Sequence, residues 1–177
     1  ALSSVAVRSP GRAAERFAAG FIAGLDDGPT VTAHEGVQRG VQFTLTPLGA
    51  HAIFGVSLAA LARRVVPLDD VWPEARSLPD HLASLPDWDA RFDIIESLLI
   101  SRLTRARVPD DRGALAWALT QIERTGGTMP VRAIAVELGW SHRHLVQQFH
   151  ERVGLPPKLV GRLVRFDRLI RHLKVGH

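Results

Sequence analysis

The sequence predicts an α+β fold that is mostly α-helical, with a small β-rich part at the N-terminus followed by helices. Three observations lead to this prediction. Apolar and polar residues alternate over residues 37–45 (VQRGVQFTL), which is typical of a strand. From about residue 47 onward, apolar residues recur at helical spacing instead. Residues 131–149 (VRAIAVELGWSHRHLVQQF) then show the spacing of two short helices joined by a tight turn.

The first part of the chain is expected to hold short strands. Residues 17–25 and 31–34 are typical of extended segments, and the turn-forming run Asp-Asp-Gly-Pro lies between them at 26–29. Residues 37–45 are predicted to add a strand. Its apolar side would consist of Val37, Val41, Phe43 and Leu45. These segments are interpreted as parts of a β-sheet or barrel.

Residues 47–64 are expected to form two short helices. Gly55 would interrupt them, and Ser57 is a suitable N-cap for the second helix. A last short strand is predicted at 65–68, with Asp69 and Asp70 on an exposed turn after it. The acidic pair is interpreted as solvated, because catalysis needs carboxyls held in a cleft with opposed pKa values.

Two further helices are predicted before the middle of the chain. One covers 77–85, and the other begins after the N-cap Asp87 and runs to about 107. The inner face of the longer helix is expected to consist of Phe92, Ile95, Leu98, Leu99 and Leu103. Pro109 and the aspartates after it mark a boundary between a regulatory or dimerisation region, 1–108, and a second domain, 109–177.

The second domain is expected to open with a helix over 110–125, capped by Asp110 or Asp111 and ended by Gly126 and Gly127. Its inward residues would be Leu115, Leu119 and Ile122. Pro130 then starts the two-helix unit, in which the small Ala135 allows a close helix crossing. The first helix of that unit ends at Gly139, and Ser141 caps the second, which covers 142–153 and ends at Gly154. Its inward residues are Leu145, Phe149 and Val153.

The outer face of the helix 142–153 carries side chains that could contact DNA. The layout is that of a homeodomain-like helix-turn-helix, whose second helix enters the major groove. Arg143 could donate to guanine, Gln147 could pair with adenine, and Val146 could touch a thymine methyl. Ser141 and the free N–H groups at the helix start could hold a phosphate. The same face also carries His142, His144 and His150.

Two sequence runs resemble the AraC-type family of transcriptional regulators. The first follows the order L-A-x-x-x-G-x-S-x-x-x-L-x-x-x-F, with Val136 in place of a usual small or polar residue. It is carried by Ala135, Gly139, Ser141, Leu145 and Phe149. The second follows the order G-x-x-P-K-x-x-x-R-x-x-R-F. It is carried by Gly154, Pro157, Lys158, Arg162, Arg165 and Phe166. Residues 40–72 are similar to an N-terminal effector or dimerisation region of the family.

The resemblance implies two helix-turn-helix units joined by a long linker helix, which 157–174 would provide. Since the chain stops at His177, we expect the second unit to be missing and the N-terminal domain to be incomplete. The resemblance implies a structural role for Arg165 and Phe166. On the basic face of this linker helix, Lys158 and Arg162 are the residues that we expect to contact phosphate. A small-molecule effector of unidentified chemistry and a homodimer are further expectations, with the helix at 88–107 as a candidate for dimerisation.

Charge is distributed unevenly along the chain. Residues 1–108 hold 11 Arg against 12 acidic residues, a net charge of −1. Residues 109–177 hold 11 basic against 6 acidic residues, a net charge of +5, and within 141–177 the balance is 8 against 2, or +6. A positive excess that coincides with the proposed recognition helix favours a polyanionic partner such as double-stranded DNA, although basic helix faces are often merely solvated.

Other functions are disfavoured by the residues themselves. The chain has no cysteine, so a disulfide, a Cys-based zinc site and a thiol nucleophile are excluded. His142 and His144 point about 200° apart on a helix and cannot chelate one metal. No phosphate-loop order or catalytic triad is found, and we expect neither a cofactor nor enzyme activity. Phe43, Leu45 and Phe54 could line a ligand pocket, but the same residues also suit a plain hydrophobic core, and the core is favoured.

The chain is therefore predicted to be a sequence-specific transcriptional regulator that places helix 142–153 in the major groove. Without a membrane-spanning run or a signal peptide, it is expected in the cytoplasm. The alternative is a helical protein-interaction or dimerisation module without specific DNA readout. That module would bind its partner without needing Arg143 or Gln147.

Overall fold

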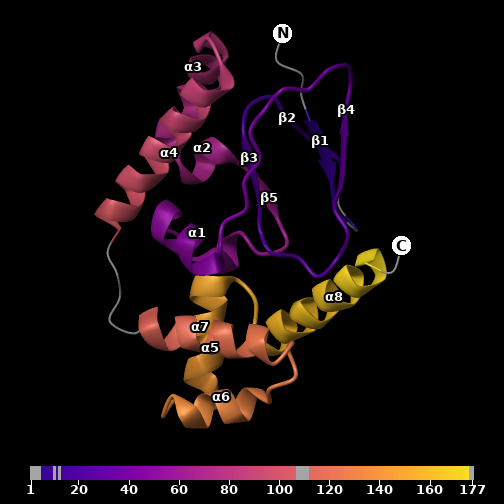
Figure 1. The fold of residues 1–177 in the computed structure, drawn as a ribbon, viewed down its shortest axis with the longest axis vertical. Coiled ribbons are helices and arrows are strands. Elements are labelled where there is room, and N and C mark those ends of the chain that lie inside the picture. Colours follow the sequence, from indigo (N-terminus) through magenta and orange to yellow (C-terminus); the bar gives the residue numbers. More distant parts are fainter. Residues whose placement is uncertain (1–4, 10, 12, 107–111, 176–177) are drawn as a thin grey trace.

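The computed structural model describes residues 5–9, 11, 13–106 and 112–175 (Figure 1). It confirms an α+β fold that is mostly helical, with small N-terminal sheets followed by helices. The strands are β1 (Val5–Arg8), β2 (Glu15–Phe17), β3 (Phe21–Ala23), β4 (Val31–His34) and β5 (Val65–Pro67). The helices are α1 (Pro47–Phe54), α2 (Leu68–Val71), α3 (Leu78–Ser84), α4 (Trp88–Arg105), α5 (Arg112–Arg124), α6 (Val131–Glu137), α7 (His142–Val153) and α8 (Pro157–Val175). Two short 3₁₀ turns are η1 (Leu58–Ala60) and η2 (Pro73–Ser77).

The strands form two small antiparallel sheets. β1 lies between β2 and β4, and β3 pairs with β5. In the first sheet Val5 lies opposite Phe17 on one side and His34 on the other. Because side chains alternate along a strand, Val5 and Val7 point the same way and are buried together with Phe17. The expected extended segments are therefore present, with a bend at 18–20 that separates β2 from β3.

The strand predicted at 37–45 is wrong. This segment belongs to neither sheet and has no regular secondary structure. Val37 is 81% exposed and Phe43 is 47% exposed, and only Leu45 packs against a buried cluster. Alternation alone does not make a strand, because the backbone also needs a ladder partner and the apolar side needs a surface to cover.

The two helices expected over 47–64 are found as α1 and the 3₁₀ turn η1. Thr46 caps α1 by accepting a hydrogen bond from the N–H of Gly49 at 3.1 Å, and Gly55 ends it with φ +67°. Ser57 precedes η1 but makes no side-chain cap. Its hydroxyl instead donates to the carbonyl oxygen of Glu151 in α7 at 3.3 Å. The predicted strand at 65–68 is β5, and Asp69 and Asp70 lie in the short helix α2.

The long helix α4 begins as predicted, because the Asp87 carboxylate accepts from the N–H of Ala90 at 2.8 Å. Its predicted inner face is only partly correct. Ile95 is buried, whereas Phe92 and Leu103 are largely exposed. Arg102 lies on the inner side instead, with its guanidinium stacked 4.8 Å from the ring centroid of Trp72. α4 does carry the predicted apolar stripe, but only part of that stripe packs against the rest of the protein.

The C-terminal helices α5 to α8 share one core. Its fully buried side chains come from three different helices. They are Leu115, Ala118, Ile134, Leu145 and Phe149, each 0% exposed. The predicted ends at Gly126 and Gly127 are confirmed, and both residues have positive φ. The expected caps Asp110 and Asp111 and the expected boundary at Pro109 lie outside the described residues.

The N-terminal half is joined to the helical module through α1 and η1, which contact the C-terminal part of α7 (Figure 1). Leu48 and Ala62 pack against the module's core. A Cβ added at Gly154 would lie 2.8 Å from the carbonyl oxygen of Leu58, so the chain after α7 sits directly on η1. Among the described helices, none combines the length and apolar character that crossing a membrane would need.

Candidate nucleic-acid interface

The two-helix unit formed by α6 and α7 has the predicted local structure. Ile134 and Ala135 of α6 are buried against the core that α7 completes, so the small Ala135 lies where the helices meet. Gly139 takes φ +65°, which reverses the chain after α6. The N–H of Trp140 then donates to the carbonyl oxygen of Ala135 at 2.9 Å. This turn fixes the direction in which α7 leaves α6.

α7 begins and ends at the predicted residues. Ser141 lies before the first turn in an extended conformation, and its hydroxyl accepts from the N–H of His144 at 3.1 Å. Gly154 ends the helix with φ +90°. Because the Ser141 hydroxyl already caps the helix, a phosphate at this end would be held mainly by the remaining N–H groups of the first turn.

One face of α7 is buried and the other is open to solvent. Leu145, Phe149 and Val153 lie inward and are at most 1% exposed. The predicted contact residues are distributed over the rest of the helix surface. Ser141, His142, Arg143, Gln147 and His150 are exposed, and His144 and Val146 are half-buried. With 3.6 residues per turn, Arg143, Gln147 and His150 share one face.

His144 has a second role that the sequence left open. Its ring packs edge-on against the indole of Trp140, with ring centroids 4.6 Å apart. This contact ties the turn between α6 and α7 to the first turn of α7. His144 therefore packs within the two-helix unit as well as lying on the predicted contact face.

The two basic residues predicted to hold phosphate lie one turn apart on α8. Lys158 is exposed in the first turn. Arg162 is also exposed, but its guanidinium donates to the carboxylate of Asp27 in the N-terminal half. Arg165 donates to the carbonyl oxygen of Gly127, which fits its expected structural role, whereas Phe166 is 60% exposed and does not belong to the core.

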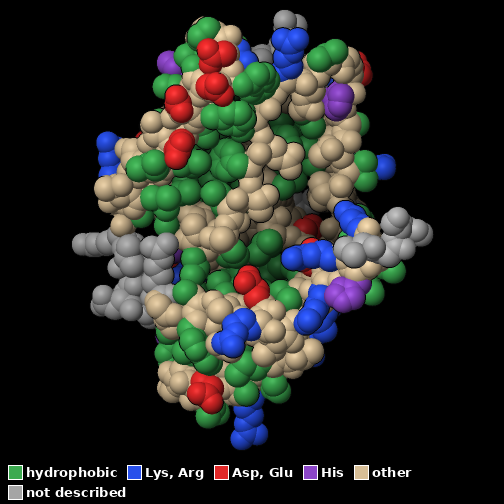
Figure 2. All heavy atoms as spheres, viewed as in Figure 1, with side chains coloured by type: hydrophobic (Ala, Val, Ile, Leu, Met, Phe, Trp, Pro, Cys, Tyr) green, Lys and Arg blue, Asp and Glu red, His purple; other side chains and the backbone are tan. Residues whose placement is uncertain are grey.

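The space-filling view shows where charge gathers on one face of the molecule. Acidic side chains lie over α3 and α4 at one end, and several Lys and Arg side chains lie over α8 and the module at the other (Figure 2). Six of the eight basic residues in 141–177 lie on α8, which runs from the module toward the N-terminal sheets in Figure 1.

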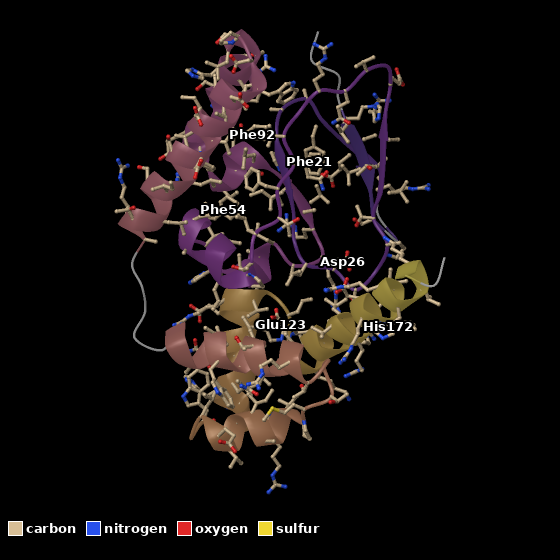
Figure 3. All side chains as sticks on the ribbon, in the orientation of Figure 1. Phe21, Asp26, Phe54, Phe92, Glu123 and His172 are labelled. Atoms are coloured by element: carbon tan, nitrogen blue, oxygen red, sulfur yellow. The ribbon has the colours of Figure 1, made fainter. Side chains whose placement is uncertain are left out.

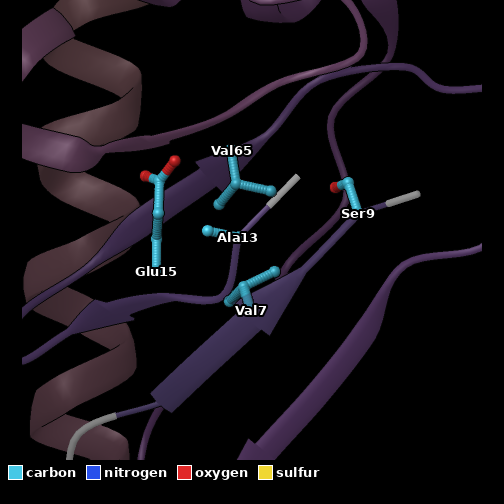
Figure 4. A pocket seen from close by; sticks show the side chains of 5 residues that line it. All are labelled: Val7, Ser9, Ala13, Glu15 and Val65. Carbon is cyan, nitrogen blue, oxygen red and sulfur yellow. The ribbon is translucent and has the colours of Figure 1, made fainter. Parts of the chain in front are cut away.

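No alternative centre for chemistry emerges from the part of the chain that the structure describes. Within it, no group of three or more His, Asp or Glu side chains is placed to hold a metal ion. A small hollow lies between the sheets (Figure 4). Its lining consists of Val7, Ser9, Ala13, Glu15 and Val65. Phe43, Leu45 and Phe54 do not line it. Phe54 and Leu45 belong to a core cluster, as expected, whereas Phe43 is 47% exposed and the expectation of a core position is wrong for it.

Asp27 and Arg63 lie at the junction of the two halves, and neither was predicted from the sequence to have a role there. Asp27 accepts hydrogen bonds from both Arg63 and Arg162. The run 26–29 was recognised as a turn, but nothing local in the sequence indicated that this turn contacts a helix 135 residues further along.

Comparisons with protein-family models, with curated proteins and with solved structures each found no match. The resemblance to AraC-type regulators therefore rests on the two motif runs.

Proposed function

We propose that this chain is a sequence-specific DNA-binding transcriptional regulator of the AraC type, with α7 as its recognition helix. The observation that carries the proposal is the division of α7 into a fully buried face and an exposed face bearing Arg143, Gln147 and His150. A rigid helix with polar side chains along one open face can enter the major groove.

The proposal gives specific roles to three side chains of α7 and to Lys158. The planar guanidinium of Arg143 would donate to O6 and N7 of a guanine, and the amide of Gln147 would pair with an adenine. Val146, at the edge of the exposed face, would contact a thymine methyl. Lys158 and the N–H groups at the start of α7 would hold phosphates, which position the protein without reading sequence. The mechanism is recognition, and no bond is made or broken.

A salt-dependent fluorescence anisotropy titration tests the proposal. The chain would be titrated with random duplex and with sequences selected from a duplex pool. Binding should prefer selected sequences and fall steeply with salt, because phosphate contacts release counterions. Arg143→Ala should cost about 1–3 kcal/mol on the best site and relax the preference at one base. Arg105→Ala removes the same charge from α4 and should leave the preference unchanged. An unaltered preference in Arg143→Ala would count against this register of α7.

Self-association through α4 is the second candidate function, and one observation favours it. α4 leaves large apolar side chains exposed along its length: Trp88, Phe92, Ile100 and Leu103. With 3.6 residues per turn, Trp88, Phe92 and Leu103 lie on one side of α4. Two copies packed along this side would cover these apolar side chains.

Sedimentation velocity tests this second candidate with a matched pair of variants. Phe92→Asp puts a charge into the proposed interface and should shift dimer to monomer. Val136→Asp makes the same kind of change at another exposed apolar residue, on α6, and should leave the dimer intact. A wild-type chain that is monomeric at high concentration would exclude self-association through α4.

A further inference from the structure

The turn between β3 and β4 places one carboxylate between two guanidinium groups from distant parts of the chain. Asp27 Oδ1 accepts from Arg63 Nε at 2.9 Å, and Asp27 Oδ2 accepts from Arg162 of α8. The Asp27 side chain is 22% exposed, so it is the most enclosed of the three. The neighbouring Asp26 is labelled in Figure 3, where this turn lies against α8.

Backbone contacts hold this carboxylate in place. Arg63 has φ +56°, the only positive φ at a non-glycine position among the described residues. Its N–H donates to the carbonyl oxygen of Leu25 at 2.9 Å, which ties Arg63 to the strand end before the turn. A Cβ at Gly24 would lie 1.9 Å from the carbonyl oxygen of Leu61, so the two segments touch through backbone. A strained residue held by close backbone packing often marks a functional position.

The carboxylate of Asp27 is chemically similar to the DNA phosphate that Arg162 is predicted to contact. The hydrogen bond from Arg63 is the main cause that lowers the pKa of the Asp27 carboxyl below its ordinary value, with the charge of Arg162 contributing. The group is therefore an anion at neutral pH. A carboxylate and a phosphate both bind guanidinium through anionic oxygens. Arg162 cannot donate the same N–H to both.

We propose that Asp27 is an autoinhibitory contact that competes with a DNA phosphate for Arg162. The inference rests on the proposed function and adds regulation to it. With Asp27 in place, Lys158 is exposed for phosphate while Arg162, one turn further along α8, is occupied. Movement of the β3–β4 turn away from α8 frees the second cation and strengthens DNA binding without altering the base contacts of α7.

The strength of the contact suits a reversible device. Arg162 is 58% exposed, and exposed ion pairs are weak enough for DNA to displace. Asp27→Asn should therefore tighten DNA binding about two- to fivefold at low salt. This is the change in Kd that corresponds to the free energy of an exposed ion pair. The gain should be the same on selected and random duplex, because a phosphate contact carries no sequence information. The salt slope should steepen by about one unit.

Anisotropy titrations of five variants test the competition. Asp26→Asn makes the same charge change at the neighbouring residue, whose carboxylate accepts a hydrogen bond from the N–H of Gly28 at 3.0 Å. Asp27→Asn and Asp27→Ser should both exceed Asp26→Asn in affinity. In an Arg162→Gln background, the gain from Asp27→Asn should disappear, as expected when two residues act through one contact.

The outcomes separate this inference from the proposed function. If the wild type binds duplex and Asp27→Asn and Asp26→Asn have the same affinity, the competition is overturned, while the proposed DNA recognition by α7 is unaffected. A gain that persists in the Arg162→Gln background would also overturn it, because Asp27 would then act through another group. Failure of every folded variant to bind duplex would overturn both.

Discussion

The helical module and the N-terminal strands are built around cores of very different depth. In the module, side chains from α5, α6 and α7 meet at residues that are 0% exposed, with Phe149 and Leu145 among them. The strand core consists of Val5, Val7 and Phe17, each still 3–7% exposed, and β4 is exposed along its whole length. The part that would read DNA is therefore held rigid by its own packing. The strands depend more on their neighbours, which makes them the more easily moved part.

The largest expected effect compares one phenylalanine from each core. Phe149→Ala should destabilise the protein by about 3–5 kcal/mol, because a fully enclosed site leaves a cavity that cannot collapse. Phe17→Ala should cost about 3 kcal/mol or less, since its small and partly open cluster can close around the gap. Urea denaturation followed by circular dichroism measures both. Equal losses would show that the two cores are equally rigid.

A smaller effect is expected from backbone packing inside the module. Gly127 has φ +75°, and an added Cβ would lie 2.1 Å from the carbonyl oxygen of Gly161 in α8. Gly127→Ala should therefore cost about 2–4 kcal/mol, from both the left-handed backbone and the clash.

Gly139→Ala is the matched control for that substitution. Gly139 also has positive φ, but nothing lies within 4 Å of an added Cβ. It should cost only about 1–2 kcal/mol. Thermal unfolding of the two variants isolates the contribution of the close contact between α8 and the α5–α6 turn. Identical melting temperatures would mean that α8 shifts freely away from this turn.

The smallest effect concerns binding rather than stability. Lys158→Ala should weaken binding to all duplexes similarly and reduce the salt slope by about one unit, because it removes one phosphate contact. Lys174→Ala removes the same charge near the other end of α8 and serves as the control. A loss confined to particular sequences would contradict a phosphate role for Lys158.

The helical module was predictable because its signals are local. Ser141 and Gly154 mark the two ends of α7 in the sequence, and the 3.6-residue period identifies which side chains it buries. The exposed positions of Arg143 and Gln147 follow from the same period. These features need only neighbouring residues, so the sequence contains them directly.

The strands and the junction were less predictable because they depend on distant residues. β1 pairs with β4 across an intervening turn and two other strands, and the alternation in 37–45 gave no indication that a partner strand was missing. On α4, periodicity identified an apolar stripe but not how much of it a neighbour covers, so Phe92 was misplaced. The contact of Asp27 with Arg162 joins residues that no local pattern connects.

The C-terminal end of α7 packs on η1, and this contact determines how far the other end of the helix moves when α7 rotates. Its C-terminal end is fixed by Ser57 and by the backbone contact at Gly154, while its first turn projects away from the N-terminal half. The helix has 12 residues, so at a rise of 1.5 Å per residue it is about 18 Å long. Rotation of about 10° at the fixed end would displace the tip by about 3 Å, close to the rise of one base pair. A small pivot at η1 would therefore move Arg143 by about the rise of one base pair, if α7 reads DNA as proposed.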